Sequence, residues 1–435
     1  MDWLKRVGWL NVMLVFVPVA LVLHWVGGSG TWVFVTAALG IIPLAGLMGK
    51  STEMLAERFG PGIGGLMNAS FGNAAELIIA VIALRAGKIE VVRASLTGSI
   101  LGNILLVLGA SLFAGGLKYN RQKFNATAAG MSATLLVLAA IGLIVPAVFH
   151  GILVGQGAEH LDALERDLSL EIAIVLFVVY GLNLVFSLKT HKHLYSAGAH
   201  SPSEASSDHP TEEDSANPAI PHEADEHWSQ SVAVTVLLVS TLAVAIVSEA
   251  MIGAIEDARE AFGWTKLFVG VIVIAIVGNA AEHSSAILMA MKNRMDLAVQ
   301  IAIGSSLQIA LFVAPVLVLV SYLPGFPALN LIFAPLEVVA VTLSVLVVAL
   351  VAFDGRSNWF EGLLLLAVYV ILGIAFFNLP ESEEHHSAPT HTEESANTDS
   401  SGNLATQNVG LVSNFDWAVC GSGVDGSESV RTKLT

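Results

Sequence analysis

The sequence predicts an all-α polytopic membrane protein with eleven transmembrane helices, and three observations favour this fold class. Of its 435 residues, 54% are hydrophobic and only 13% are charged, a composition typical of membrane proteins. A helix needs ~20 apolar residues to cross a bilayer, and the chain has many segments of that length. A phrase of five residues also occurs twice, each time inside such a segment. These features favour a membrane protein over a soluble enzyme or a nucleic-acid-binding protein.

Eleven apolar segments are long enough to be membrane spans. They cover residues 9–26, 31–49, 61–84, 94–117, 124–149, 170–188, 229–252, 267–291, 297–321, 329–353 and 359–378. Many are rich in Gly, Ala and Ser, as expected where helix backbones approach closely in lipid. The first segment follows Lys5 and Arg6, but its apolar part is long for a secretory signal, so we predict a true helix. The single cysteine, Cys420, excludes a disulfide within one chain.

The repeated phrase divides the chain into two halves. The letters GNAAE at 72–76 recur at 278–282, which is 206 positions later. At the same offset Ser99 aligns with Ser305, so each glutamate of the phrase precedes a serine by 23 residues. Five spans separate the equivalent helices, and an odd number reverses their orientation in the membrane. We therefore predict two inverted five-helix repeats, an architecture typical of secondary transporters.

These boundaries predict five regions along the chain. They are an extra N-terminal helix at 1–28, a first repeat at 29–189, an acidic loop at 190–228, a second repeat at 229–379 and a disordered acidic tail at 380–435. The loop and the tail carry most of the net charge of −16. The loop, which is also rich in histidine, is either a segment that associates with cations or a solvated connector.

The positive charges near the membrane predict the orientation of the chain. With the N-terminus in the cytoplasm, twelve Lys and Arg residues close to the spans fall inside and six fall outside, which agrees with the positive-inside rule. The loop at 190–228 is then cytoplasmic. The compact chain favours the plasma membrane of a bacterium.

Two glutamates at bilayer depth, Glu76 and Glu282, are the strongest functional signal. An ionised carboxylate at that depth costs ~2.5–3.5 kcal/mol, and no Lys or Arg lies near either glutamate in its own helix. Each carboxylate is therefore expected to hold a proton or a metal ion. We predict that the two form one cation site shared between the halves. Because neighbouring carboxylates resist joint ionisation, protons and a divalent cation would compete for this site.

The residues around the glutamates predict a cage of oxygen ligands. Gly72 and Gly278 permit a break in each helix, which would free backbone carbonyl groups. Asn73 and Asn279 tolerate irregular backbone and add amide oxygens. Such ligands favour a hard cation such as Ca²⁺, but they do not select it over Na⁺ or Mn²⁺.

A second polar layer follows each copy of the motif. Ser99 and Asn103 are spaced to share one helical face, and so are Ser305 and Gln308. The halves differ at this layer, because Asn103 aligns with Ile309 while Gln308 aligns with a glycine. These side chains are either further cation ligands or ordinary hydrogen-bonding groups between helices.

Three other titratable residues are weaker candidates. Glu53 and Glu249 lie near the end of the first helix of their halves, and they are either gating carboxylates or interfacial residues. His283 directly follows Glu282 and either relays protons or packs against its neighbours.

The two motif pairs resemble those of the cation/proton exchangers, the CAX branch of the calcium/cation antiporter superfamily. The resemblance covers residues 1–378 and rests on GNAAELIIA followed by GSILGN, and on GNAAEHSSA followed by GSSLQI. The sodium/calcium exchanger branch usually has a proline where this chain has Ala75 and Ala281, which favours the proton-coupled branch.

The resemblance implies a secondary antiporter, not an enzyme, that exports Ca²⁺ from the cytosol in exchange for H⁺ by alternating access and needs no cofactor. It implies that Glu76 and Glu282 are shared Ca²⁺ and H⁺ ligands, and that backbone carbonyls around Ala74 and Ala280 complete the shell. It further implies gating roles for Glu53 and Glu249 and a Ca²⁺-sensing role for the acidic loop.

Three alternative functions follow from the same residues. A Na⁺/Ca²⁺-type exchanger would use a similar site, and a cation channel would use the glutamates as a filter, although an inverted repeat argues against a channel. An intramembrane hydrolase built on Glu282 and His283 would lack the HExxH spacing of zinc hydrolases. The sequence leaves open the choice among Ca²⁺, Mn²⁺ and Cd²⁺, the proton stoichiometry and the oligomeric state, a homo-oligomer included.

Overall fold

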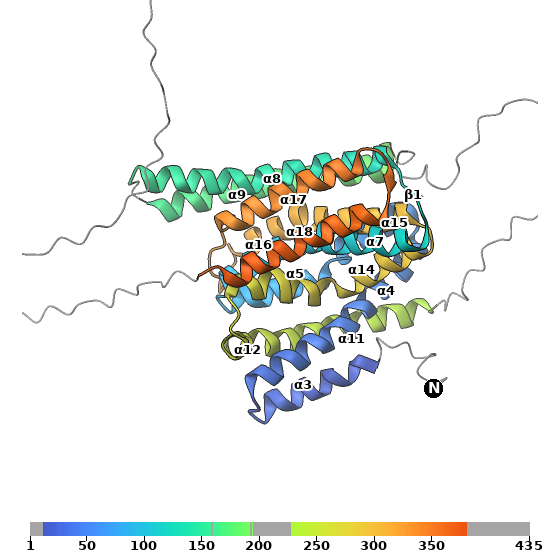
Figure 1. Ribbon diagram of the computed structural model, residues 1–435. Helices are drawn as coiled ribbons and strands as arrows, with labels where there is room; N and C mark the ends of the chain where they lie inside the picture. The colour runs from blue at the N-terminus through green and yellow to red at the C-terminus, as the bar shows by residue number, and fades with distance from the viewer. Residues whose placement is uncertain (1–11, 158–159, 192–193, 195–227, 381–435) are drawn as a thin grey trace, which may run out of the picture. The chain divides into compact units, whose positions relative to one another are not determined.

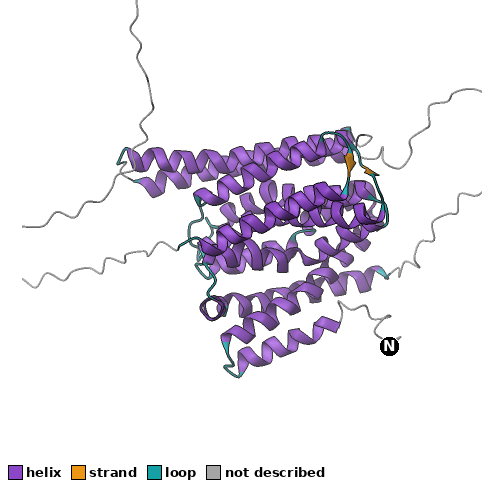
Figure 2. Ribbon diagram, in the orientation of Figure 1, coloured by secondary structure: helices purple, strands orange, loops and turns teal. Residues whose placement is uncertain are grey.

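The computed structural model describes residues 12–157, 160–191, 194 and 228–380, all of which belong to one compact unit, Met1–Ser382. Most of these residues are helical (Figures 1 and 2). The acidic segment at 195–227 and the tail from 381 onward lie outside the described residues. The predictions made for that loop and tail therefore stay predictions.

The first half of the chain contains the N-terminal helix and the first copy of the motif. Its elements are η1 (Met13–Val15), α3 (Phe16–Trp25), α4 (Gly30–Phe71), α5 (Ala74–Arg85), α6 (Ile89–Leu101), η2 (Gly102–Val107), α7 (Leu108–Lys118), β1 (Gln122–Lys123), α8 (Ala126–Gly155), α9 (Leu161–Val185) and η3 (Phe186–Thr190). Of these, η1 is a 3₁₀ turn, while η2 and η3 are π-helical turns.

The second half contains the second copy of the motif. Its elements are α11 (Gln230–Gly253), α12 (Ile255–Phe262), α13 (Lys266–Phe268), η4 (Val269–Ile274), α14 (Ala275–Met291), α15 (Met295–Gln308), η5 (Ile309–Val313), α16 (Ala314–Val320), α17 (Pro335–Ala352), β2 (Arg356–Ser357) and α18 (Trp359–Asn378). Both η4 and η5 are π-helical turns.

Nine helices among the described residues are long and apolar enough to cross a membrane, and Met13–Trp25 is a shorter apolar helix. This confirms a polytopic helical membrane protein, although the count is below the eleven spans that the sequence predicts. Two predicted spans account for the difference. The span at 9–26 is the short helix Met13–Trp25, and the span at 61–84 is divided between the end of α4 and α5.

The long helix α4 bends sharply between Ala56 and Gly64. A Cβ atom added to Gly64 would lie 1.9 Å from the carbonyl oxygen of Ala56, eight residues earlier. A straight α-helix rises 1.5 Å per residue, so residues eight apart would be ~12 Å apart along its axis. The chain therefore turns back on itself between these two residues without leaving the helical conformation. A second interruption follows at Gly72 and Asn73, between α4 and α5.

Two further features differ from the sequence prediction. The first is α9, which begins at Leu161 rather than near 170, because Asp162, Glu165 and Asp167 are helical although their charge suggested a loop. The second is a two-residue antiparallel pairing, Gln122 with Ser357 and Lys123 with Arg356, in a protein predicted to be entirely helical. Pairing between segments so far apart in sequence leaves no local pattern.

The helices that carry the repeated motif lie in the middle of the packing. In Figure 1, α5, α14 and α15 run between a group formed by α3, α4 and α11 on one side and a group formed by α8, α9 and α17 on the other. Small residues allow close approach at the centre, where a Cβ atom added to Gly270 would lie 2.3 Å from Cβ of Ala94. Other helices therefore enclose the motifs on both sides.

Residues related by the 206-residue offset meet at the centre of the unit. The Ser306 hydroxyl donates to the backbone carbonyl of Ile100 at 3.4 Å, and these two residues occupy equivalent positions in the two halves. Groups related by a two-fold axis can touch only where they lie close to that axis. The π-helical turns η2 and η5 follow Ser99 and Ser305, respectively, so they too lie at nearly equivalent positions of the two halves.

An ion-pair network connects α12 to the turn between α5 and α6. Nζ of Lys88 lies 2.7 Å from Oε1 of Glu256, and Nε of Arg259 lies 2.8 Å from Oε2 of the same carboxylate. Burial by itself would raise the pKa of Glu256, but the hydrogen bonds and charges of Lys88 and Arg259 outweigh it and lower the pKa below its ordinary value. This carboxylate is therefore ionised at neutral pH.

Candidate cation site

The first glutamate of the repeated phrase lies in the first turn of a helix. The interruption at Gly72 and Asn73 starts α5 at Ala74, so Glu76 lies where the positive end of the helix dipole favours negative charge. Only 9% of Glu76 is exposed, and its Oε2 atom has no hydrogen-bond partner. A buried carboxylate with an unpaired oxygen is unfavourable unless a cation or a proton satisfies it.

The second glutamate lies inside a continuous helix. Glu282 is half-buried in α14 and accepts a hydrogen bond from the hydroxyl of Ser305, the serine 23 residues later. This bond joins α14 to α15 and fixes one carboxylate oxygen. The sequence predicts Ser305 only as part of a second polar layer, either as a further cation ligand or as a hydrogen-bonding group between helices, and its role as a ligand stays a prediction.

The glycine of the second motif makes room for the glutamate of the first. A Cβ atom added to Gly278 would lie 3.3 Å from Cγ of Glu76 and 3.7 Å from its Oε1 atom. Gly278 precedes Glu282 by one helical turn, so Glu76 packs directly against the helix that carries Glu282. The two carboxylates are close enough for the charge of Glu282 to act on Glu76. The fold thus brings the predicted pair together.

Amide side chains link the two halves around this pair. Asn73 donates through Nδ2 to Oε1 of Gln308. Asn279 donates to the hydroxyl of Ser99 at 3.0 Å and to the carbonyl of Ala275 at 2.9 Å, and its own Oδ1 lies 3.3 Å from Nδ2 of Asn103. Each motif asparagine therefore contacts the second polar layer of the opposite half.

Three buried side-chain oxygens near the glutamates have no hydrogen-bond partner. They are Oδ1 of Asn73, Oδ1 of Asn103 and Oε2 of Glu76. Both asparagines are almost completely buried, at 2% and 1% exposure. Their nitrogen atoms are engaged in the bonds described above, which leaves the oxygens as acceptors. Unpaired acceptors around a carboxylate pair suit a hard cation with oxygen ligands.

The predicted break at Gly278 is absent, because α14 continues from Ala275 to Met291. The packing of Glu76 explains the glycine instead, since any side chain here would crowd that carboxylate. The carbonyl of Ala280 is consequently not freed, and it also accepts a bond of 2.9 Å from the Ser284 hydroxyl. The helix is thus interrupted just before Ala74, whereas the equivalent residue Ala280 lies inside a continuous helix.

The weaker candidates are more exposed than Glu76. Glu53 on α4 and Glu249 on α11 both have exposed side chains. His283 is half-buried and its Nε2 atom has no hydrogen-bond partner. Their predicted gating and proton-relay roles stay predictions.

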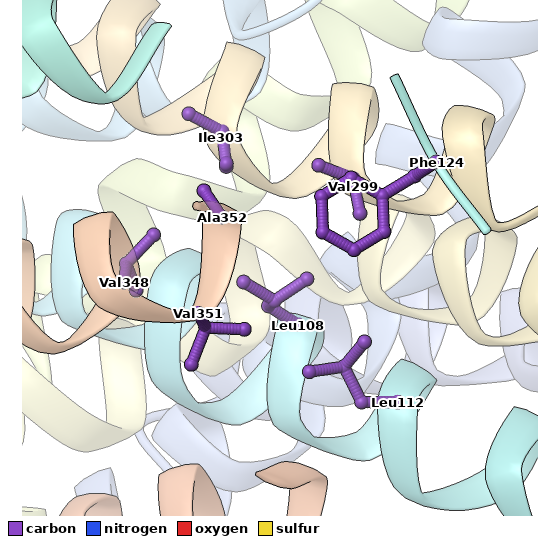
Figure 3. A pocket seen from close by; sticks show the side chains of 8 residues that line it. All are labelled: Leu108, Leu112, Phe124, Val299, Ile303, Val348, Val351 and Ala352. Carbon is purple, nitrogen blue, oxygen red and sulfur yellow. The ribbon is translucent and has the colours of Figure 1, made fainter. Parts of the chain in front are cut away.

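A small cavity elsewhere in the protein is not a cation site. It lies among α7, α15, α17 and the residue Phe124, and Figure 3 shows that carbon-only side chains point toward it. Its lining residues are Leu108, Leu112, Phe124, Val299, Ile303, Val348, Val351 and Ala352. A cavity without oxygen ligands cannot hold a hard cation.

Some features of the site have no clear signal in the sequence. The π-helical turns η2 and η5 follow directly after the polar residues of α6 and α15, and such turns often occur at functional sites. Asn103 is itself the second residue of η2. The class of protein defined by this fold and site is a polytopic helical membrane protein with buried carboxylate and amide oxygens gathered between its two halves.

Comparison with known proteins places this class more narrowly. The family model described as sodium/calcium exchanger protein matches residues 29–189 and 232–378. The Ca²⁺/H⁺ antiporter of Synechocystis sp. is 47% identical over 369 residues, covering 85% of this chain and 97% of that protein. The vacuolar calcium ion transporter of Schizosaccharomyces pombe is 40% identical, covering 86% of this chain and 85% of that protein.

A solved structure is also similar to this protein over most of the chain. The structure of native YfkE is similar with a TM-score of 0.69 and 41% sequence identity, covering 85% of this chain and all of that one. The chain belongs to the sodium/calcium exchanger family, in the branch of the cation/proton exchangers.

Proposed function

We propose that this protein is a secondary antiporter that exports Ca²⁺ from the cytosol in exchange for H⁺. The names of its relatives support this proposal, because the similar proteins of Synechocystis sp. and Bacillus subtilis, each 47% identical, are both called Ca²⁺/H⁺ antiporters. The observation that carries the proposal is the packing of Glu76 against Gly278, one turn before Glu282, among unpaired amide oxygens.

The proposed mechanism follows from the charge of the site. Ca²⁺ would take oxygens from Glu76 and Glu282, together with the free amide oxygens of Asn73 and Asn103. Two protons would neutralise the same two carboxylates. The empty site has a net charge of −2, and enclosing that charge in a low-dielectric interior is energetically unfavourable. Binding of one Ca²⁺ or of two protons removes this charge. Only the loaded site would then be transferred between the two sides of the membrane, which is the condition for obligatory exchange.

The remaining groups would position these ligands. The Ser305 hydroxyl donates to Oε2 of Glu282 and leaves Oε1 of that carboxylate for the ion. Ser99 and Gln308 each bind the amide of a motif asparagine from the opposite half. We assign Ser99 and Gln308 to positioning and not to direct ligation in this arrangement.

We propose the membrane topology from the predicted spans and the distribution of positive charges. The chain has eleven spans, with the N-terminal helix outside two inverted five-helix repeats. The distribution of positive charges puts the N-terminus and the acidic loop in the cytoplasm, and the membrane is the plasma membrane of a bacterium. The bent helix α4 supports this count, because its two arms and α5 together would supply the two spans predicted at 31–49 and 61–84.

Flux measurements on proteoliposomes test the proposed function. With the membrane potential clamped, we expect an imposed pH gradient to drive Ca²⁺ against its concentration gradient, and an ionophore that collapses the pH gradient to stop this transport. A Na⁺ gradient of the same size at equal pH should have no effect. Transport that follows Na⁺, or Ca²⁺ movement that is downhill at every pH gradient, would contradict the proposal. Repeating the experiment at several potentials gives the stoichiometry, since each net charge moved contributes ~2.3 kcal/mol per 100 mV.

A further inference from the structure

A second buried cluster of charged residues lies behind the candidate cation site. Arg93 on α6 donates to the backbone carbonyl of Asn330 at 3.2 Å and also to the Oδ1 atom of that residue. Glu165 on α9 is 5% exposed, and Glu337 in the first turn of α17 is 2% exposed. Both carboxylates act electrostatically on Arg93. The face of α6 that carries Arg93 is not the face that carries Ser99, so this cluster is separate from the motif glutamates.

The cluster contains one more buried carboxylate than it has buried permanent cations. Arg93 neutralises one of the two buried glutamates. Glu90 on the same helix is exposed and pairs with Lys266 at 3.1 Å, so it does not supply the missing positive charge. His150 on α8 contacts Glu165, with Nδ1 2.5 Å from Oε1. Because buried charges are paired, one proton must be held within the cluster.

Hydrogen bonding distinguishes the two carboxylates. Glu165 is close to two donors, His150 on one oxygen and Nδ2 of Asn330 at 3.3 Å on the other, which suits an ionised group. Glu337 accepts from the backbone N–H of Ala334 through Oε2 at 2.8 Å, but its buried Oε1 atom has no partner.

A threonine hydroxyl lies beside the Glu337 carboxyl group. Thr97 is 1% exposed and interacts with that carboxyl, although its Oγ1 atom makes no hydrogen bond of regular geometry. The hydroxyl can donate to the ionised carboxylate or accept a hydrogen bond from a proton on the neutral acid, so it can serve both protonation states. The charge count requires one proton within the cluster, and burial favours Glu337 as its holder, because Glu337 is the more buried of the two carboxylates and Glu165 contacts His150.

We propose that Glu337 is a second proton-binding site of this protein, separate from the glutamate pair that we propose for transport. The bound proton is exchangeable, because Arg93 and the N-terminus of α17 favour the ionised carboxylate while burial favours the neutral acid. When the proton leaves, the new negative charge competes with Asn330 for Arg93. Arg93 is on the helix that carries Ser99 and Asn103, so proton release would act on the helix behind the cation site.

Infrared spectroscopy of the purified full-length protein tests this inference. The measurement uses the Glu76→Gln/Glu282→Gln variant, in which the proposed transport carboxyls cannot contribute. We expect the carbonyl stretch of a protonated carboxylic acid, shifted by exchange into D₂O and lost as the pH is raised. Adding Glu337→Gln should remove this band. Adding Glu165→Gln should keep the band at low pH but make it disappear at a lower pH than in the background variant, because Arg93 then has only Glu337 to neutralise. Thr97→Val should move the band to higher frequency without removing it, because the acid loses its hydrogen-bond acceptor.

The result does not depend on whether the protein transports Ca²⁺, since the background variant has no proposed transport site. Absence of the band at every pH, or its persistence after Glu337→Gln, would overturn the inference. Each variant is first checked for a monodisperse, helical state. If Glu337→Gln does not fold, the Thr97→Val frequency shift still decides, because an acid located elsewhere would not respond to that substitution.

Discussion

Replacing Glu76 or Glu282 by glutamine is expected to abolish exchange of Ca²⁺ for H⁺. Each substitution removes one of the two negative charges that Ca²⁺ requires, and it also removes a group that protons can occupy. Removing one partner of a buried charge pair typically costs ~3–5 kcal/mol, which corresponds to a loss of at least ~100-fold in affinity. Initial rates of pH-driven Ca²⁺ uptake into proteoliposomes measure this loss.

Two control variants make this result specific. Glu57→Gln removes an exposed carboxylate from α4 and should leave the rate unchanged. Glu282→Asp keeps the charge but withdraws it from Ser305, so it should retain partial activity with weaker apparent affinity for Ca²⁺. Full pH-driven uptake by either glutamine variant would show that the pair does not form the transport site.

Replacing Gly98 by alanine is expected to destabilise the protein far more than the equivalent change at Gly304. A Cβ atom at Gly98 would lie 2.2 Å from the carbonyl oxygen of Val271 and 2.5 Å from its Cα atom, so the backbones of α6 and η4 would have to separate. A Cβ atom at Gly304 would meet nothing within 4 Å. The two glycines occupy equivalent positions of the repeat and differ only in their surroundings. Overpacking of this kind costs ~1–3 kcal/mol.

Thermal unfolding of the detergent-solubilised variants measures the difference. We expect a clear fall in Tm for Gly98→Ala and little change for Gly304→Ala. Because Ser99 follows Gly98 directly, Gly98→Ala should also weaken the bond between Ser99 and Asn279 and reduce transport. Equal effects of the two substitutions would mean that α6 and η4 do not cross as closely as described.

The repeated phrase allowed much of the candidate site to be predicted from the sequence. The equal offset of the glutamates and serines predicted that both halves contribute, and the structure brings Glu76 against Gly278 and Ser305 against Glu282. The family comparison confirms the resemblance that the same motifs suggested. Such residues are visible in the sequence because polar groups at bilayer depth stand out from apolar neighbours.

The sequence predicted that the second polar layers differ, but not that the two glutamates would have different partners. In the second half Glu282 bonds the serine 23 residues later, whereas in the first half Ser99 bonds Asn279. The reason is that α5 starts anew at Ala74 while α14 continues unbroken through Gly278, so the two glutamates point differently. Both copies of the motif have the sequence GNAAE, so contacts with residues distant in the sequence must decide which helix is interrupted.

Other features depend on pairings between distant segments. The helical conformation of α4 continues through residues 50–60, where charged residues suggested a loop, and the chain turns back there between Ala56 and Gly64. Glu337 gave no motif signal, because its neighbours Arg93 and Thr97 are more than 200 positions away in the sequence. Local patterns carry helix type and polarity, but they do not carry these tertiary contacts.

The central claim is that Ca²⁺ and protons compete for one site formed by Glu76 and Glu282. The most direct measurement is the number of protons released when Ca²⁺ binds the purified protein, obtained by calorimetry in buffers of different ionisation enthalpy. We predict that Ca²⁺ binding releases protons, that its affinity falls as the pH is lowered, and that both effects are lost in Glu76→Gln/Glu282→Gln. Tight Ca²⁺ binding without proton release over the whole pH range would contradict this account.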